Sequence, residues 1–82
     1  MQLVYKNETI KHIKKINPKD LQKVKKKITN LIKNPLLGKP LHGELEGLYS
    51  LKAWPLRIIY TLNTRTQVIE IITIDYRGSV YH

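Results

Sequence analysis

The feature that most constrains the fold is a series of three apolar segments joined by very short connections. Residues 48–53, 56–62 and 67–75 are rich in β-branched and aromatic residues, and only Trp54-Pro55 and the stretch "NTRT" separate them. Segments of this length and composition are typical of β-strands. Because such short connections join strands that run antiparallel, the C-terminal half predicts three antiparallel strands.

The N-terminal part predicts one more strand followed by a helix. Residues 2–6 read "QLVYK" and form a short strand candidate. Asn7 is expected to cap a helix over residues 8–16, with Glu8 in its first turn, where the helix dipole favours an acid. The expected apolar edge of this helix consists of Ile10, Ile13 and Ile16.

A second helix is predicted directly afterwards. Asn17 is its expected cap, and Pro18 occupies the first helical position, where its missing N–H costs nothing. Asn34-Pro35 ends the helix. Residues 36–47 contain three glycines and a proline and are expected to form a loop. The apolar residues of the helix recur at helical spacing: Leu21, Val24, Ile28, Leu31 and Ile32.

The order β-α-α-β-β-β predicts an α+β domain that spans residues 1–82. We expect the helical hairpin to pack on one face of a small, mainly antiparallel sheet, which leaves the other face open. A chain of 82 residues has room for one core. It contains no cysteine, no secretion signal and no apolar run of roughly 18 residues, so we expect a soluble, cytoplasmic protein without a membrane partner.

The positive charge is unevenly distributed along the chain. The net charge is +9, of which residues 1–33 carry +8, from ten lysines and two acids. Two explanations fit this run of lysines equally well. The lysines either form a solvated face of a helix, or they attract nucleic acid or an acidic protein. Residues 34–82 carry only +1, but their few cations stand singly among apolar residues.

Two of these single cations are predicted to face each other. Any symmetric hairpin across Trp54-Pro55 places Lys52 opposite Arg57, whether its loop has two or four residues. Proline at the second loop position argues against the two-residue turn. Alternation puts both cations with Ser50, away from the face of Leu51, Ile58, Tyr60 and Leu62. Since like charges in opposite positions are unfavourable, either solvation or a bound anion must relieve them.

The C-terminal tail adds groups that RNA binding requires. It reads "IDYRGSVYH" and supplies Arg77, Tyr81 and His82. Aromatic rings stack on unpaired bases, and arginine binds phosphate through two parallel hydrogen bonds. A two-residue turn at Thr64-Arg65 would put Arg77 and Arg57 on opposite faces. A shared site therefore requires an odd loop, a β-bulge, or a chain that leaves the sheet.

The stretch "NPLLGKPLHGELEGLYSLKAWPLRIIYTL", followed by "IDYRGSVY", resembles the RelE/ParE superfamily of bacterial toxins. The resemblance covers nearly the whole chain, and it implies the same order of strands and helices. Its RelE branch consists of ribosome-dependent endoribonucleases that cleave mRNA in the ribosomal A site, and a cognate antitoxin neutralises them. The resemblance therefore implies three partners: an antitoxin with an acidic, partly helical segment, the ribosome and mRNA.

By position, Arg57, Lys52, Arg77 and Tyr81 resemble the catalytic residues of that branch. Ser50 stands where some members have a further lysine. With Lys39 and His82 it completes the expected RNA contacts. Cleavage would proceed by attack of a 2′-OH on the scissile phosphate, with no cofactor or metal. Arg57 and Lys52 would hold the phosphate and stabilise the transition state.

The sequence does not decide which residue acts as the general base. The candidates are Glu46, His42, Glu44, Asp75 and His82, and histidine titrates in the appropriate range. Lys52 is a further candidate if its pKa is lowered by Arg57. Two other functions also remain open: a ParE-like inhibitor of DNA gyrase, and a non-catalytic basic module that binds RNA or protein.

Overall fold

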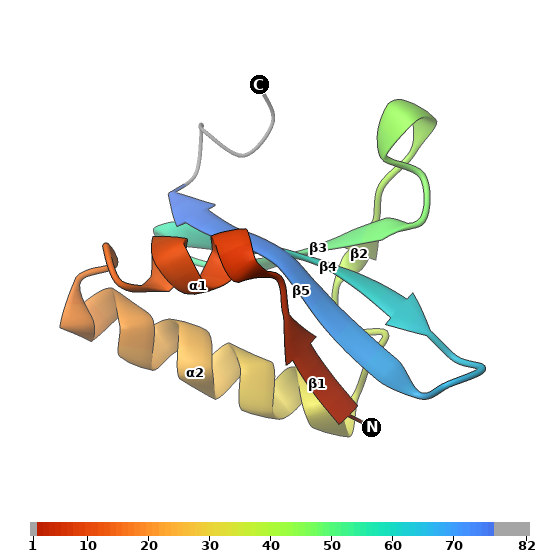
Figure 1. Ribbon diagram of the computed structural model, residues 1–82, viewed down its shortest axis with the longest axis horizontal. Helices are drawn as coiled ribbons and strands as arrows, with labels where there is room; N and C mark the ends of the chain where they lie inside the picture. The colour runs from red at the N-terminus through yellow and green to blue at the C-terminus, as the bar shows by residue number, and fades with distance from the viewer. Residues whose placement is uncertain (1, 77–82) are drawn as a thin grey trace.

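The computed structural model describes residues 2–76, and the elements follow the predicted order with one addition (Figure 1). The described chain contains two α-helices and five strands. Their bounds are β1 Gln2–Tyr5, α1 Asn7–Ile13, α2 Pro18–Lys33, β2 Lys39–Pro40, β3 Leu48–Ala53, β4 Leu56–Asn63 and β5 Val68–Tyr76, and a short 3-10 turn, η1, spans Gly43–Leu45.

The strands form one mixed sheet in the order β1-β5-β4-β3-β2. β1 runs parallel to β5, and the other neighbouring pairs are antiparallel. The predicted α+β class, with two helices packed on a small and mainly antiparallel sheet, is confirmed. None of the helices within residues 2–76 is long and apolar enough to cross a bilayer.

The predicted loop over residues 36–47 contains the additional strand. Lys39 pairs with Ser50 and Pro40 pairs with Tyr49, so β2 forms the edge of the sheet beside β3. Proline has no N–H to donate and is therefore tolerated at a sheet edge. The sequence prediction missed β2 because two residues that include a proline do not form a recognisable strand pattern.

The first helix differs from its prediction in position and in its buried side. It begins at Asn7 with Lys6 in the cap position, and it ends at Ile13 instead of residue 16. Ile10 is 44% exposed, whereas Thr9 is fully buried. The expectation that Ile10 faces the core was wrong, because the inward positions of α1 are Thr9 and Ile13.

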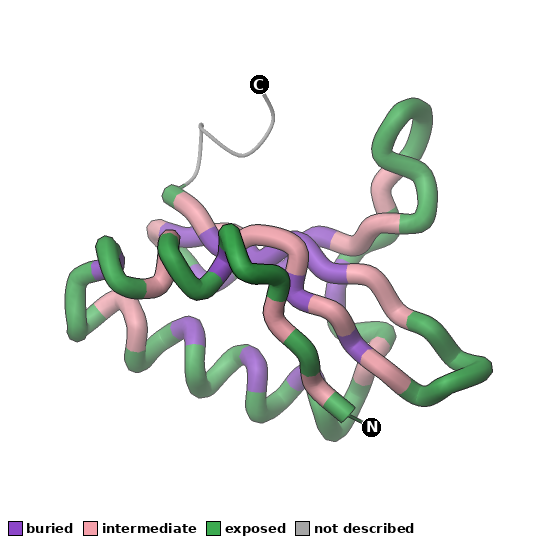
Figure 2. The backbone as a smooth tube through the Cα atoms, in the orientation of Figure 1, coloured by how far each residue is buried: buried purple, intermediate pink, exposed green. Residues whose placement is uncertain are grey.

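The second helix begins and ends as predicted, although Ile32 of the expected apolar side is exposed. The Asn17 side chain accepts a hydrogen bond from the Lys19 N–H, and Pro18 begins the helix. Val24, Ile28 and Leu31 recur along α2 and pack against the buried residues of the central strands. Figure 2 shows buried positions recurring along this helix and in the middle of the sheet. The core therefore lies between the helices and one face of the sheet.

This packing predicts unequal costs for two neighbouring truncations in α2. Leu31 is fully buried in the core, so Leu31→Ala should lower the free energy of unfolding by about 2–5 kcal/mol. Ile32 is 38% exposed, and Ile32→Ala should cost less than about 1 kcal/mol. Urea unfolding followed by circular dichroism measures both, and equal losses would contradict the described orientation of α2.

Candidate functional site

The site begins with the pairing of β3 and β4. Lys52 lies directly opposite Arg57, and Leu51 lies opposite Ile58, as the sequence predicted. Leu51 and Ile58 are buried in the core, whereas Lys52 is exposed and Arg57 is half-buried. The two cations therefore lie side by side on the face of the sheet that points away from the helices.

The turn that joins these strands differs from its prediction. Ala53 pairs with Leu56, so the connection contains only Trp54 and Pro55. The Trp54–Pro55 peptide bond is cis, the isomer of a β-turn with proline at its third position. The expectation that proline disfavours a two-residue turn here was wrong, because it took only the primed turn types into account.

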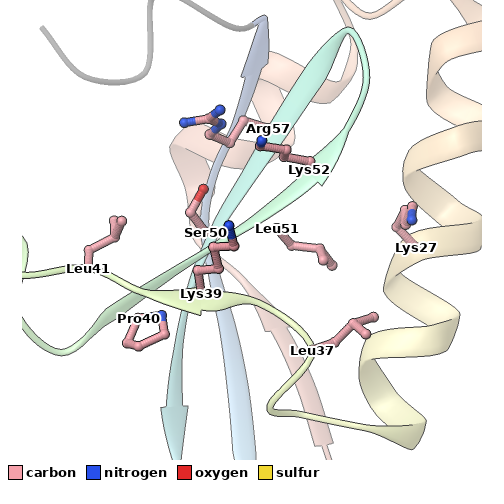
Figure 3. A pocket seen from close by; sticks show the side chains of 9 residues that line it. All are labelled: Lys27, Leu37, Lys39, Pro40, Leu41, Ser50, Leu51, Lys52 and Arg57. Carbon is pink, nitrogen blue, oxygen red and sulfur yellow. The ribbon is translucent and has the colours of Figure 1, made fainter.

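A groove lies beside these cations, with a volume of about 500 Å³. We call it the basic groove. It collects residues from β2, β3, β4 and α2 and from the loop before β2 (Figure 3). Its lining contains four of the predicted site residues, Lys39, Ser50, Lys52 and Arg57, together with Lys27, Leu37, Pro40, Leu41 and Leu51.

The charges of the basic groove all have the same sign. Lys27, Lys39, Lys52 and Arg57 line it, and no aspartate or glutamate is among the described residues of its lining. Figure 3 shows Lys52 and Arg57 at one end and Lys27 across from them on α2. Like charges on one concave surface repel one another and attract anions. The groove therefore suits a phosphate, with apolar side chains beside it for a sugar or base.

Lys39 reaches this groove because a core residue anchors the chain next to it. Tyr60 is fully buried, yet its hydroxyl accepts a hydrogen bond from the Gly38 N–H at 3.0 Å and donates one to the Pro35 carbonyl at 2.9 Å. A Cβ atom at Gly38 would lie 2.6 Å from the Tyr60 hydroxyl oxygen. Glycine is therefore required where the chain passes this ring, directly before β2.

A β-bulge in β5 determines what lies on the other side of Arg57. From Asn63 to Tyr60 the pairing of β4 with β5 follows one register, and it shifts between Ile59 and Tyr60. Beyond the shift, Arg57 pairs with Asp75. A β-bulge is one of the three arrangements that would allow Arg57 and Arg77 to share a face, and Arg77 itself lies outside the described residues.

Two further predicted site residues within residues 2–76, His42 and Glu46, do not line the groove. His42 and Glu46 flank η1 and are exposed, in the loop that stands away from the sheet in Figure 1. Arg77, Tyr81 and His82 lie outside the described residues. Lys27 was not predicted as a site residue, because its position within a lysine-rich helix gave no signal that distinguished it from its neighbours.

Comparisons with known proteins agree on one family. A family model described as "ParE-like toxin of type II bacterial toxin-antitoxin system" matches residues 3–82. Toxin RelE of Mycobacterium tuberculosis (strain ATCC 25618 / H37Rv) is 36% identical over 73 residues, which cover 77% of this chain and 75% of that relative.

Solved structures of the same type share the fold. The RelBE2 toxin–antitoxin complex from Mycobacterium tuberculosis aligns with a TM-score of 0.86 at 26% identity, covering 93% of this chain and 96% of the other. The isolated RelE toxin of E. coli aligns with a TM-score of 0.81 at 21% identity, covering 98% and 89% respectively, and this second likeness concerns the fold alone.

The Tyr60 anchor predicts a measurable stabilisation by one hydroxyl group. Tyr60→Phe leaves the Gly38 N–H and the Pro35 carbonyl without this partner, so the free energy of unfolding should fall by about 1–3 kcal/mol. Tyr49 stacks on Tyr60 with ring centroids 5.3 Å apart, but its hydroxyl is not part of the anchor. Tyr49→Phe is therefore the matched control, with an expected change within about 0.5 kcal/mol in urea unfolding.

The same residue predicts a dependence of stability on alkaline pH. Burial raises the pKa of Tyr60 above its ordinary value of 10.0. The folded chain therefore keeps this proton at a pH where the unfolded chain loses it, so the contribution is complete below pH 10 and decreases as the pH rises further. Unfolding measured below and above pH 10 should show a smaller alkaline loss in Tyr60→Phe than in the unchanged chain. Equal losses would show that Tyr60 is not the titrating group.

Proposed function

Since this chain belongs to the ParE-like toxins of type II bacterial toxin–antitoxin systems, we propose that it is a ribosome-dependent endoribonuclease that cleaves mRNA in the ribosomal A site. The observation that carries the proposal is the basic groove, in which Lys52 and Arg57 face each other at one end. The related M. tuberculosis protein carries the name RelE, which supports the RelE branch of the superfamily.

The proposed reaction is a transesterification within the RNA. The 2′-oxygen attacks the adjacent phosphorus, and the bond from phosphorus to the 5′-oxygen breaks. A base takes the proton of the 2′-OH, and the leaving 5′-oxygen receives a proton. Negative charge grows on the phosphate oxygens during this step, so fixed cations next to them lower the barrier.

Arg57 and Lys52 supply those cations. They come from adjacent positions of two paired strands, so the sheet itself fixes their separation. A phosphate between them would be attracted by both cations. Arginine retains its proton at a pH far above neutrality, so Arg57 acts through charge and hydrogen bonding and does not donate the proton to the leaving group.

The other roles follow from the lining of the groove and from the family resemblance. Lys39 and Ser50 line the groove and would contact the RNA backbone. Arg77 is proposed as a second phosphate contact, Tyr81 as a stacking partner for a base and His82 as a further RNA contact; these three lie outside the described residues. Among the candidate bases, Asp75 lies opposite Arg57 in the sheet, whereas His42 and Glu46 would have to reach the RNA from the loop between β2 and β3.

The proposed partners follow from charge and from the relatives. The net charge of +9 suits mRNA and ribosomal RNA, and it also suits an antitoxin that covers the toxin with an acidic, partly helical segment. Several solved structures that share the fold are complexes of toxin and antitoxin, among them RelBE2 of M. tuberculosis and the archaeal RelE–RelB complex of Pyrococcus horikoshii. A ribosome-dependent toxin would act in the cytoplasm.

A second function has one specific observation in its favour. The matched family model is described as ParE-like, and the sequence analysis left inhibition of DNA gyrase open. Such an inhibitor needs the same fold and an antitoxin, but it does not need a phosphate held between Lys52 and Arg57. The two functions therefore differ in what a change at Arg57 does to RNA cleavage.

The proposal predicts a large loss of cleavage when Arg57 is changed. Arg57→Ala should lower the rate of mRNA cleavage on programmed ribosomes by about 100- to 1000-fold, because one fixed group that stabilises the transition-state charge is lost. Arg65 is an exposed arginine in the turn between β4 and β5 and does not line the groove, so Arg65→Ala is the matched control with a nearly unchanged rate. Toeprinting locates the cuts, which are expected in the A site.

Two results would contradict the nuclease. If Arg57→Ala cleaves as fast as the unchanged chain, the groove is not the active site. If induction of the unchanged chain produces gyrase-linked DNA breaks without A-site cuts, the ParE-like function replaces the proposed one. A growth defect that persists in Arg57→Ala without either lesion would indicate a non-catalytic binding module.

A further inference from the structure

We propose that Thr9 is a positioning residue for the surroundings of Arg57, which lines the basic groove, because its hydroxyl holds the β5 bulge that places Asp75 opposite Arg57. The inference rests on the proposed function for its effect on RNA cleavage. The contact itself is a feature of the fold and can be tested independently. Thr9 lies in α1, outside the groove and on the other side of β5 from the strand that carries Arg57.

Thr9 contacts the chain at the bulge. Its hydroxyl oxygen lies 2.6 Å from the Ile72 carbonyl oxygen and 3.1 Å from that of Ile71. The side chain is fully buried, and Thr9 is the one buried residue that α1 contributes. A buried hydroxyl needs a hydrogen-bond acceptor, and here two consecutive carbonyls of β5 provide it.

The contact lies where strand pairing on that side of β5 ends. β1 pairs with β5 only up to Tyr5 and Ile71, and the Lys6 N–H donates to the Ile71 carbonyl just beyond. The next carbonyl along β5 belongs to Ile72, and the Thr9 hydroxyl reaches it from the first turn of α1. Beyond the end of β1, the hydrogen bond to the next carbonyl of β5 therefore comes from a side chain of α1.

Ile72 is also the residue left over by the register shift. Ile59 pairs with Thr73 and Tyr60 pairs with Ile71, so Ile72 has no counterpart on β4. If the earlier register continued without a bulge, Ile74 would lie opposite Arg57, and Asp75 would turn toward the helices. Since a shift of one residue moves every following side chain to the other face, the bulge determines which residues of β5 share a face with Arg57.

Two substitutions at this position separate the hydroxyl from the shape of the side chain. Thr9→Val keeps the volume and removes the O–H, which leaves a carbonyl at the bulge without its donor. Thr9→Ser keeps the O–H. Thr29 provides a matched control, because its hydroxyl donates to the Lys25 carbonyl at 3.0 Å on the exposed side of α2, away from β5.

The experiment measures register and cleavage on the same purified proteins. Backbone NOEs across β4 and β5 report whether Ile58 pairs with Ile74 and Arg57 with Asp75. We expect Thr9→Val to lose these NOEs and to cleave ribosome-bound mRNA roughly 10- to 100-fold more slowly, because a small misplacement of groups at a site can cost up to about 100-fold in rate. Thr9→Ser and Thr29→Val should keep the NOEs and should cleave within about threefold of the unchanged chain.

The possible outcomes separate this inference from the proposed function. If Thr9→Val keeps both the NOEs and the rate, or loses one without the other, Thr9 does not position the groove through the bulge. If the unchanged chain does not cleave mRNA, the proposed function fails. In that case the NOEs still decide whether Thr9 holds the register.

A deletion keeps the test decisive if Thr9→Val does not fold. Removing Ile72 abolishes the bulge, yet it leaves Thr73, Ile74 and Asp75 paired as they are now. In this background the hydroxyl no longer has a bulge to hold, so Thr9→Val should fold and should cleave within about threefold of the deletion parent. An equally severe effect of Thr9→Val in both backgrounds would overturn the inference.

Discussion

The pairing of Lys52 with Arg57 across β3 and β4 is the constraint on which the rest of the site depends. The same register buries Leu51 and Ile58 against the helices, so the core and the cation pair are fixed by one set of backbone hydrogen bonds. A slip of one residue would bury the charges and expose the core. Folding therefore selects the register that places Lys52 beside Arg57, where a bound anion could contact both side chains.

Two buried side chains, Tyr60 and Thr9, contact the backbone of segments next to β3 and β4. Tyr60 lies in the core, yet its hydroxyl fixes the chain before β2 and so determines where Lys39 lies. Thr9 acts in a similar way on the opposite side of the sheet, where a buried hydroxyl meets the bulge in β5. In both places a buried polar group contacts backbone and not ligand. Tyr60 in this way fixes the chain that leads into β2 at the groove, whereas Thr9 contacts β5, the strand that pairs with β4 next to Arg57.

The sequence predicted those parts of the molecule that depend on local patterns. The Asn17-Pro18 helix start, the apolar side of α2 and the opposition of Lys52 and Arg57 follow from spacing and turn chemistry alone. The edge strand β2, the burial of Thr9 in place of Ile10 and the β5 bulge depend on contacts between residues far apart in the chain. For the same reason, the sequence did not predict that Lys27 lines the groove, because this depends on how α2 packs beside β3.

The central claim is that RNA binds in the basic groove, with its phosphate between Lys52 and Arg57. The most direct test is an NMR titration with a short RNA that carries 2′-deoxyribose at the scissile nucleotide, so that binding occurs without cleavage. The account predicts that the largest amide shifts appear at Lys39, Ser50, Lys52 and Arg57 and disappear in Arg57→Ala. Shifts confined to the lysines of α2, unchanged in that variant, would contradict it.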